Sequence, residues 1–135
     1  MIPVCTPKFF GNEKKYVQEC LDTNWISSAG RFIPLFEDSF AKFIGVKHGV
    51  ACSNGTTAIH LAIETLEIKR GDEVIIPNLS NIATANGVIL SGAKVVLADI
   101  ERDTFGIDPA KIEEKISKKT KAILVVHLYG HPANM

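Results

Sequence analysis

The residues best suited to chemistry stand in a short run of small polar side chains, Ser53–Thr57, with the sequence SNGTT. An apolar run precedes this stretch and an amphipathic helical pattern follows it, which places its backbone N–H groups at the start of a helix. Gly55 permits a ligand to approach closely, and the helix dipole favours an anion there. The hydroxyl groups of Thr56 and Thr57 add two donors. The pattern favours a phosphate ligand, and its alternative is a helix cap of this composition that binds nothing.

Other patterns of binding sites are missing from the sequence. No lysine follows Gly55 as in a P-loop, and no G-x-G-x-x-G is present, which argues against nucleoside triphosphates and dinucleotides. His127 and His131 are four residues apart, but they lie in a strand-and-turn pattern without a third ligand, so we predict no metal site. Asp99 and Asp103 are interpreted as residues of the turn that follows a strand.

Composition excludes several classes of partner. The 135 residues include 15 Lys and Arg against 15 Asp and Glu, so no general attraction to nucleic acid or to an anionic membrane is expected. No uncharged run approaches the roughly 18 apolar residues of a membrane span, and the start of the chain does not resemble a signal peptide. The three cysteines are odd in number and lack metal-ligand spacing. A reducing, cytoplasmic setting is therefore expected.

Helical and strand patterns alternate along the chain. Helices are expected over 12–21, 34–43, 56–66, 82–90 and 108–116, and strands over 48–53, 71–77, 93–100 and 120–130. Gly45 and Gly92 are expected to end helices, whereas Asp108 and Pro109 are expected to begin one. Apolar strands separated by helices predict parallel βαβ crossovers and an α/β fold, a three-layer α/β/α arrangement with a mainly parallel sheet.

The last predicted strand leads into a turn, LYGHPANM, rather than into a closing helix or edge strand. We therefore expect these residues to form the amino-terminal part of a larger protein. A small, complete α/β domain is the alternative.

Several separated blocks occur together in one order: WISSAGR, CSNGTTAIHLAI, GDEVIIPNLSNIATAN and ILVVHLYGHPANM. In this order and spacing the sequence resembles the DegT/DnrJ/EryC1/StrS family of sugar aminotransferases, from Ile2 to Met135. The resemblance implies the fold of type I aminotransferases, the cofactor pyridoxal 5′-phosphate (PLP) and a homodimer with active sites between subunits. Residues 1–135 would belong to the large, PLP-binding domain, with a helical segment and substrate-mouth loop over 1–45 and a βαβ core over 46–135.

The resemblance also implies an activity. Within the family the chain is most similar to enzymes that aminate the 4-keto group of a GDP-linked 4-keto-6-deoxymannose, with glutamate as the amino donor. One alternative is a PLP-dependent sugar dehydratase on the same fold. Another is a truncated domain without catalysis that binds a partner or assists assembly.

Transferred to this sequence, the resemblance assigns cofactor-binding residues. Gly55 and Thr56 would donate to the PLP phosphate, while Asn54 and Thr57 would shape the same turn. Asn81 stands where relatives usually carry an aromatic residue that stacks on the pyridine ring. Asparagine cannot stack in that way, but its amide could donate to the ring hydroxyl.

Substrate-binding residues follow from the same resemblance. Trp25, Ser27, Ser28 and Gly30 would line the mouth for the nucleotide sugar. Arg31 would meet a phosphate of the nucleotide, or else be a solvated surface charge. No catalytic residue is assigned, because the family's Schiff-base lysine and the carboxylate opposite the pyridine nitrogen belong to blocks that these residues do not include. We therefore expect no amino transfer from the chain alone.

Overall fold

The computed structural model describes residues 1–3 and 5–135. They form two compact units, Met1–Ala51 and Cys52–Met135. The first unit contains two helices, α1 (Glu13–Asp22) and α2 (Phe32–Ile44). Both were expected from the sequence, and Gly45 ends α2 as predicted, in the left-handed conformation with a φ of 79°.

The strand predicted over 48–53 is wrong. This segment carries no strand pairing. A strand needs a hydrogen-bonding neighbour, and here the Ala51 backbone N–H donates instead to the Glu37 carboxylate on α2 at 2.8 Å. The apolar run therefore marked an extended segment, not a member of the sheet.

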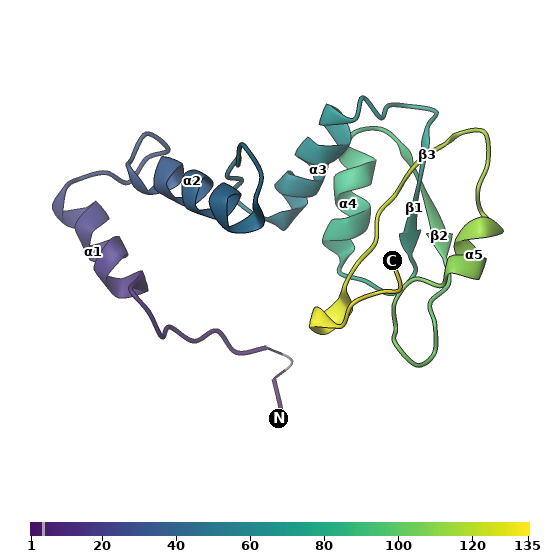
Figure 1. Ribbon diagram of the computed structural model, residues 1–135, viewed down its shortest axis with the longest axis horizontal. Coiled ribbons are helices and arrows are strands. Elements are labelled where there is room, and N and C mark those ends of the chain that lie inside the picture. Colours follow the sequence, from purple (N-terminus) through teal and green to yellow (C-terminus); the bar gives the residue numbers. More distant parts are fainter. Residues whose placement is uncertain (4) are drawn as a thin grey trace. The chain divides into compact units, whose positions relative to one another are not determined.

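The second unit is built on a three-stranded parallel sheet with the order β2-β1-β3 (Figure 1). Its strands are β1 (Glu73–Pro77), β2 (Lys94–Ala98) and β3 (Thr120–Ile123), and its helices are α3 (Gly55–Thr65), α4 (Ile82–Leu90) and α5 (Pro109–Glu113), followed by the 3-10 turn η1 (Leu128–Gly130). The predicted α/β class and parallel pairing are confirmed. The bounds of α4 are those expected, and Asp108 caps α5 with Pro109 in its first turn.

Apolar clusters cover the sheet on both faces, because alternate residues of β1 point in opposite directions. Val74 and Ile76 belong to the cluster that includes Ile63 of α3 and Val88 of α4. Ile75 belongs to the cluster on the opposite face of the sheet, against which Ile112 of α5 packs. All five residues of β1 are buried.

β3 is shorter than the predicted strand over 120–130. Leu124 N–H still donates to the Ile75 carbonyl at 2.8 Å, but the chain then leaves the sheet. The neighbouring β1 ends at Pro77, which has no N–H to continue a ladder. The apolar residues beyond Leu124 therefore pack without strand pairing. The α5 helix is likewise shorter than the 108–116 expected, since Lys115 and Ile116 donate i→i−3 turn hydrogen bonds instead of helical ones.

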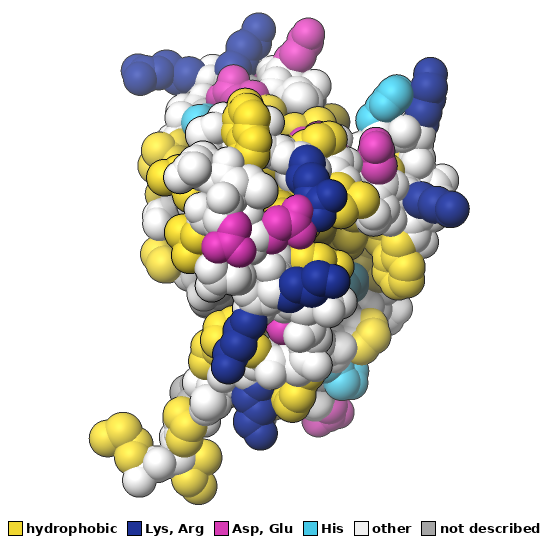
Figure 2. All heavy atoms as spheres, turned by 90° about the vertical axis from the view of Figure 1, so that its left-hand side faces the viewer, with side chains coloured by type: hydrophobic (Ala, Val, Ile, Leu, Met, Phe, Trp, Pro, Cys, Tyr) yellow, Lys and Arg dark blue, Asp and Glu magenta, His cyan; other side chains and the backbone are white. Residues whose placement is uncertain are grey.

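No helix among the described residues combines the length and the apolar character that crossing a membrane requires. On the face drawn in Figure 2, basic and acidic side chains are interspersed and apolar side chains lie exposed between them. Side chains of both signs thus share this face.

A buried carboxylate connects the amino-terminal ends of the three strands. Glu73 accepts hydrogen bonds from Ser117 Oγ at 2.6 Å and from Lys94 Nζ at 3.1 Å. The Ser117 hydroxyl, followed by the Lys94 ammonium, lowers the pKa of the Glu73 carboxyl. The folded state thus favours the ionised form of Glu73 more strongly than the unfolded chain does.

The lowered pKa of Glu73 makes stability depend on pH. A depressed carboxyl pKa contributes stability above the pKa of the unfolded chain, and this contribution is lost as pH falls through the folded pKa. We expect Glu73→Gln to flatten the loss of unfolding free energy between roughly pH 5 and pH 3. Urea denaturation at several pH values measures it. Ser117→Ala should flatten the dependence of the unfolding free energy on pH more than Lys94→Met does. If wild type and Glu73→Gln showed the same dependence, Glu73 would not be its cause.

Candidate functional site

The candidate site lies at the carboxyl edge of the sheet, where two helices begin. α4 connects the parallel strands β1 and β2, so it must start at the carboxyl edge of β1. α3 leads through a short loop into the amino-terminal end of β1, and it packs against α4 (Figure 1). The N-termini of both helices therefore face the same edge, the usual location of ligands in open α/β sheets.

The first turn of α3 is shaped by two of the predicted residues. Asn54 Oδ1 accepts from Thr57 N–H at 3.0 Å, and Thr57 Oγ1 accepts from Asn54 N–H at 3.3 Å, which together form a capping box. The Thr57 hydroxyl also donates to the Asn54 carbonyl at 2.8 Å. Asn54 and Thr57 are thus engaged with each other and hold the turn in shape.

Two N–H groups of this turn remain available. Among the described residues, the backbone N–H groups of Gly55 and Thr56 have no hydrogen-bond partner, and neither has the Thr56 hydroxyl. Unpaired donors at a helix N-terminus attract an anion because the helix dipole acts in the same sense. The N–H groups and the Thr56 hydroxyl are among the donors that the SNGTT pattern suggested, whereas the Thr57 hydroxyl, also expected as a donor, is engaged with Asn54.

Gly55 stands beside open space. A Cβ added there would meet no atom within 4 Å, and the residue is not in the left-handed conformation that favours glycine. Neither packing within the described chain nor backbone strain therefore requires a glycine at this position. A ligand that approaches the backbone closely would require one.

The first turn of α4 carries Asn81, whose Oδ1 accepts from Ala83 N–H at 3.0 Å. The side chain thus serves as a helix cap, a role that was not expected for it. Its Nδ2 group has no partner within the part of the chain that the structure describes. Asn81 can therefore cap α4 and still offer its amide donor to a ligand.

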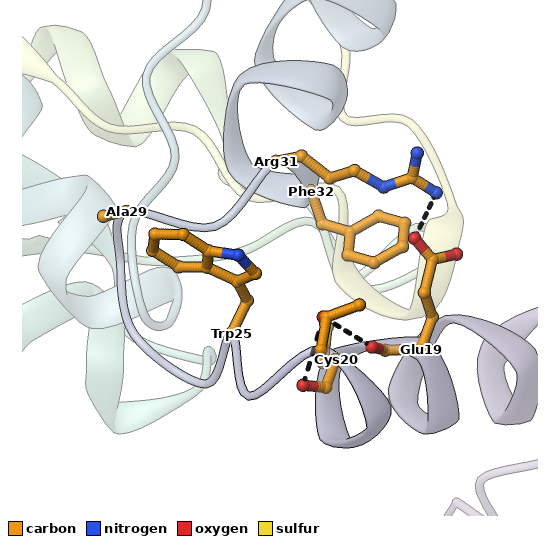
Figure 3. Close-up of a pocket in the computed structure, with 7 residues that line it drawn as sticks. Glu19, Cys20, Trp25, Ala29, Arg31 and Phe32 are labelled. Atoms are coloured by element: carbon orange, nitrogen blue, oxygen red, sulfur yellow. Dashed lines mark hydrogen bonds and ion pairs between the residues drawn. The ribbon is translucent and has the colours of Figure 1, made fainter.

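The residues expected at the substrate mouth belong to the first unit. Trp25 and Arg31 line a pocket of about 400 Å³ together with Glu19 and Phe32 (Figure 3). A second pocket, of about 230 Å³, shares Trp25 and Phe32 and adds Ser27 and Gly30. Ser28 lines neither of these two pockets. Four of the five predicted residues thus line one or the other of two pockets, and Trp25 lines both.

Arg31 is already partnered. Its guanidinium pairs with the Glu19 carboxylate at 2.5 Å and lies 4.9 Å from the centre of the Phe32 ring (Figure 3). The arginine is therefore a largely exposed charge that is paired with one carboxylate, and not a fully free phosphate ligand. The sequence did not indicate a role for Glu19. An acidic residue on a polar helix is common, and its position gives no sign that Arg31, at the end of the following loop, lies beside it.

Comparisons of the sequence with known proteins find matches over nearly the whole chain. The model of the DegT/DnrJ/EryC1/StrS aminotransferase family matches residues 8–135. The GDP-perosamine synthase of Caulobacter vibrioides is 54% identical over 134 residues, which are 99% of this chain and 36% of that protein.

Solved structures are similar over nearly the whole chain. The aminotransferase from Psychrobacter cryohalolentis matches with a TM-score of 0.87 and 35% identity, covering 94% of this chain and 32% of that one. The GDP-4-keto-6-deoxy-D-mannose-3-dehydratase of E. coli with bound hydrated PLP matches with a TM-score of 0.85 and 34% identity. The match covers 98% of this chain and 35% of that one. The chain thus spans about a third of the length of these proteins.

Proposed function

Because the chain belongs to the DegT/DnrJ/EryC1/StrS aminotransferase family, we propose that it binds the phosphate of PLP at the N-terminus of α3 and supplies the amino-terminal part of a sugar aminotransferase. The observation that carries the proposal is the pair of unpartnered N–H groups of Gly55 and Thr56, beside the open space at Gly55. The relative with bound hydrated PLP supports the identity of the cofactor.

The residues present fit this cofactor. Gly55 and Thr56 would hold the phosphate through two N–H groups and one hydroxyl, and the Asn54–Thr57 capping box keeps those donors in place. Asn81 would offer Nδ2 to the ring hydroxyl. When bound, PLP supplies an electron sink for moving an amino group between carbon atoms. The lysine that the family uses for this step is expected outside these residues, so the chain alone should not transaminate.

The proposed substrate is a GDP-linked 4-keto-6-deoxymannose, aminated to the perosamine type with glutamate as donor. The name of the Caulobacter vibrioides relative supports the GDP-sugar. Trp25, Ser27, Ser28, Gly30 and Arg31 would form the mouth for the nucleotide sugar, where a phosphate would join or replace Glu19 at the guanidinium. We further propose a homodimer acting in the cytoplasm, a setting that accords with three free cysteines.

A second candidate function is a PLP-dependent sugar dehydratase. The matching E. coli structure is a dehydratase of the same GDP-linked keto sugar, at an identity close to that of the matching aminotransferase. Both reactions would use the same phosphate donors. Amino transfer from glutamate to the sugar, followed by mass spectrometry of the product, separates them.

Gly55→Ala tests the cofactor proposal. The added methyl group enters space that no described residue occupies, so folding should be retained, but it stands where the phosphate would approach. We expect PLP affinity to fall about tenfold or more, the equivalent of about 1.4 kcal/mol. Thr56→Ala should lower it similarly through loss of the hydroxyl. A PLP titration followed by absorbance, on the complete gene product that contains these residues, measures both.

Thr65→Ala is the matched control. Its hydroxyl donates to the Ala62 carbonyl at the opposite end of the same helix, away from the proposed phosphate. PLP affinity should be unchanged in this variant. The proposal is wrong if Gly55→Ala and Thr56→Ala bind PLP as the wild type does, or if inorganic phosphate does not compete with PLP.

A further inference from the structure

Two side chains link the carboxyl ends of neighbouring strands. Asn78, the first residue after β1, donates through Nδ2 to Asp99 Oδ1 at 2.9 Å, and Asp99 is the first residue after β2. Asn78 N–H also donates to the Ala98 carbonyl at 2.9 Å. The two strand ends are thus joined by one backbone and one side-chain hydrogen bond, across 21 residues of sequence.

Asp99 is held on a rigid frame. Its carbonyl accepts from Asp108 N–H at 3.0 Å, and the next residue, Ile100, forms an antiparallel bridge with Ile107. Ala98 and Ile107 are 0% and 2% exposed. Because buried neighbours fix the backbone on both sides, the Asp99 carboxylate has a defined place from which it can hold another group.

The carboxylate is also held in its ionised form. Asp99 Oδ1 accepts from Ile100 N–H at 2.9 Å in addition to the Asn78 amide. These two hydrogen bonds, the backbone one first, lower the pKa of the Asp99 carboxyl. At neutral pH it is therefore a charged acceptor, which forms stronger hydrogen bonds than a neutral one.

The group that Asp99 holds is the loop that leads into α4. This loop runs over 78–81, and each of its polar residues is tied down: Asn78 to Asp99, Ser80 Oγ to Thr84 Oγ1 at 2.7 Å, and Asn81 to Ala83 N–H. The Ser80 and Asn81 contacts lie within the loop and its own helix. Only the Asn78 contact ties the loop to a different strand, so it sets where the loop stands on the sheet.

We propose that Asp99 is a positioning residue that acts through Asn78 to place the 78–81 loop, and with it the Asn81 amide, at the cofactor. This inference rests on the proposed function, in which Asn81 contacts PLP. Asn78 and Asp99 are both exposed, and an exposed hydrogen bond adds little stability. The contribution of the pair is therefore to geometry at the site.

The test is a double-mutant cycle on the complete gene product, with PLP affinity and the absorbance maximum of bound PLP as readouts. Asp99→Ala should weaken PLP binding about fivefold to tenfold and shift the absorbance maximum, because the Asn81 donor moves relative to the ring. Asn78→Ala should have the same effect, and the double variant should be no worse than either. Asp99→Asn should retain most of the affinity, since an amide oxygen can still accept from Asn78.

Asp103→Ala is the control, since this exposed acidic residue lies in the following turn and has no hydrogen bond to the 78–81 loop. It should leave affinity and spectrum unchanged. The inference is overturned if Asp99→Ala matches the wild type, or if its effect adds to that of Asn78→Ala.

Hydrogen exchange of the backbone amides over 78–83, without cofactor, provides an independent readout. Faster exchange in Asp99→Ala supports the positioning role even if the wild type fails to bind PLP. That combination would refute the proposed function and leave the positioning of the loop standing. Unchanged exchange would overturn the positioning role directly.

Discussion

Replacing Gly87 by alanine is expected to destabilise the protein by about 1–3 kcal/mol, although alanine is the better helix former. Gly87 lies in α4 where the helix touches α3. A Cβ there would lie 2.8 Å from Ile59 Cβ, closer still to Ile59 Cγ2, and 3.3 Å from the His60 backbone nitrogen. These neighbours belong to or adjoin a helix backbone, so they cannot move aside without separating the helices. Urea denaturation of the complete gene product measures the change.

Gly55→Ala is the matched control, because the same substitution is made in the partner helix. Its Cβ meets nothing within 4 Å. The unfolding free energy should stay within about 0.5 kcal/mol of the wild type or rise slightly. If Gly87→Ala proved as stable as Gly55→Ala, the close packing of α3 on α4 would be refuted.

Replacing Ile75 by alanine is expected to have a still larger effect, a loss of about 2–5 kcal/mol. Ile75 is 0% exposed in the central strand and packs with Ala98 and Ile107. A central strand cannot shift to close the cavity, because β2 and β3 pair with it on both sides. The midpoint and slope of a urea unfolding curve give the change in free energy.

Ile89→Ala provides the comparison for Ile75. Ile89 is 58% exposed on α4, so its truncation should cost less than about 1 kcal/mol. Comparable losses for the two variants would mean that Ile75 is not part of a packed core. Since Ile75 packs against Ala98 and Ile107, Ile75→Ala should also loosen the frame of Asp99.

The sequence predicted those parts of the fold that local signals determine. Asp108 and Pro109 begin α5, Gly45 ends α2 and Gly92 follows α4 with a φ of 82°, because capping and left-handed turns depend on the residue itself. The strand over 48–53 and the length of β3 were wrong, because a strand depends on a neighbour distant in sequence. The apolar pattern indicates burial but does not say which segment pairs.

At the candidate site, too, features set by local sequence could be predicted, and contacts between distant segments could not. The capped helix start around Gly55 and Thr56 could be predicted, because its signals are contained in five consecutive residues. The Glu19–Arg31 ion pair and the Asn78–Asp99 hydrogen bond could not, since each joins two segments whose approach depends on the folded chain. The resemblance assigned Asn81 to the cofactor but gave no sign that its side chain also caps α4.

The contact between α3 and α4 at Gly87 also helps to determine the spacing of the donors at the candidate site. The two helices meet backbone against side chain and begin at the same edge of the sheet, so their packing, together with the Asn78–Asp99 hydrogen bond, sets the distance between their first turns. Under the proposed function, a ligand that extends from the donors of Gly55 and Thr56 to the Asn81 amide would then be selected by its length. A variant that separated the helices would be expected to relax this selection before it abolished binding, so that shorter or longer phosphate esters would compete more nearly equally.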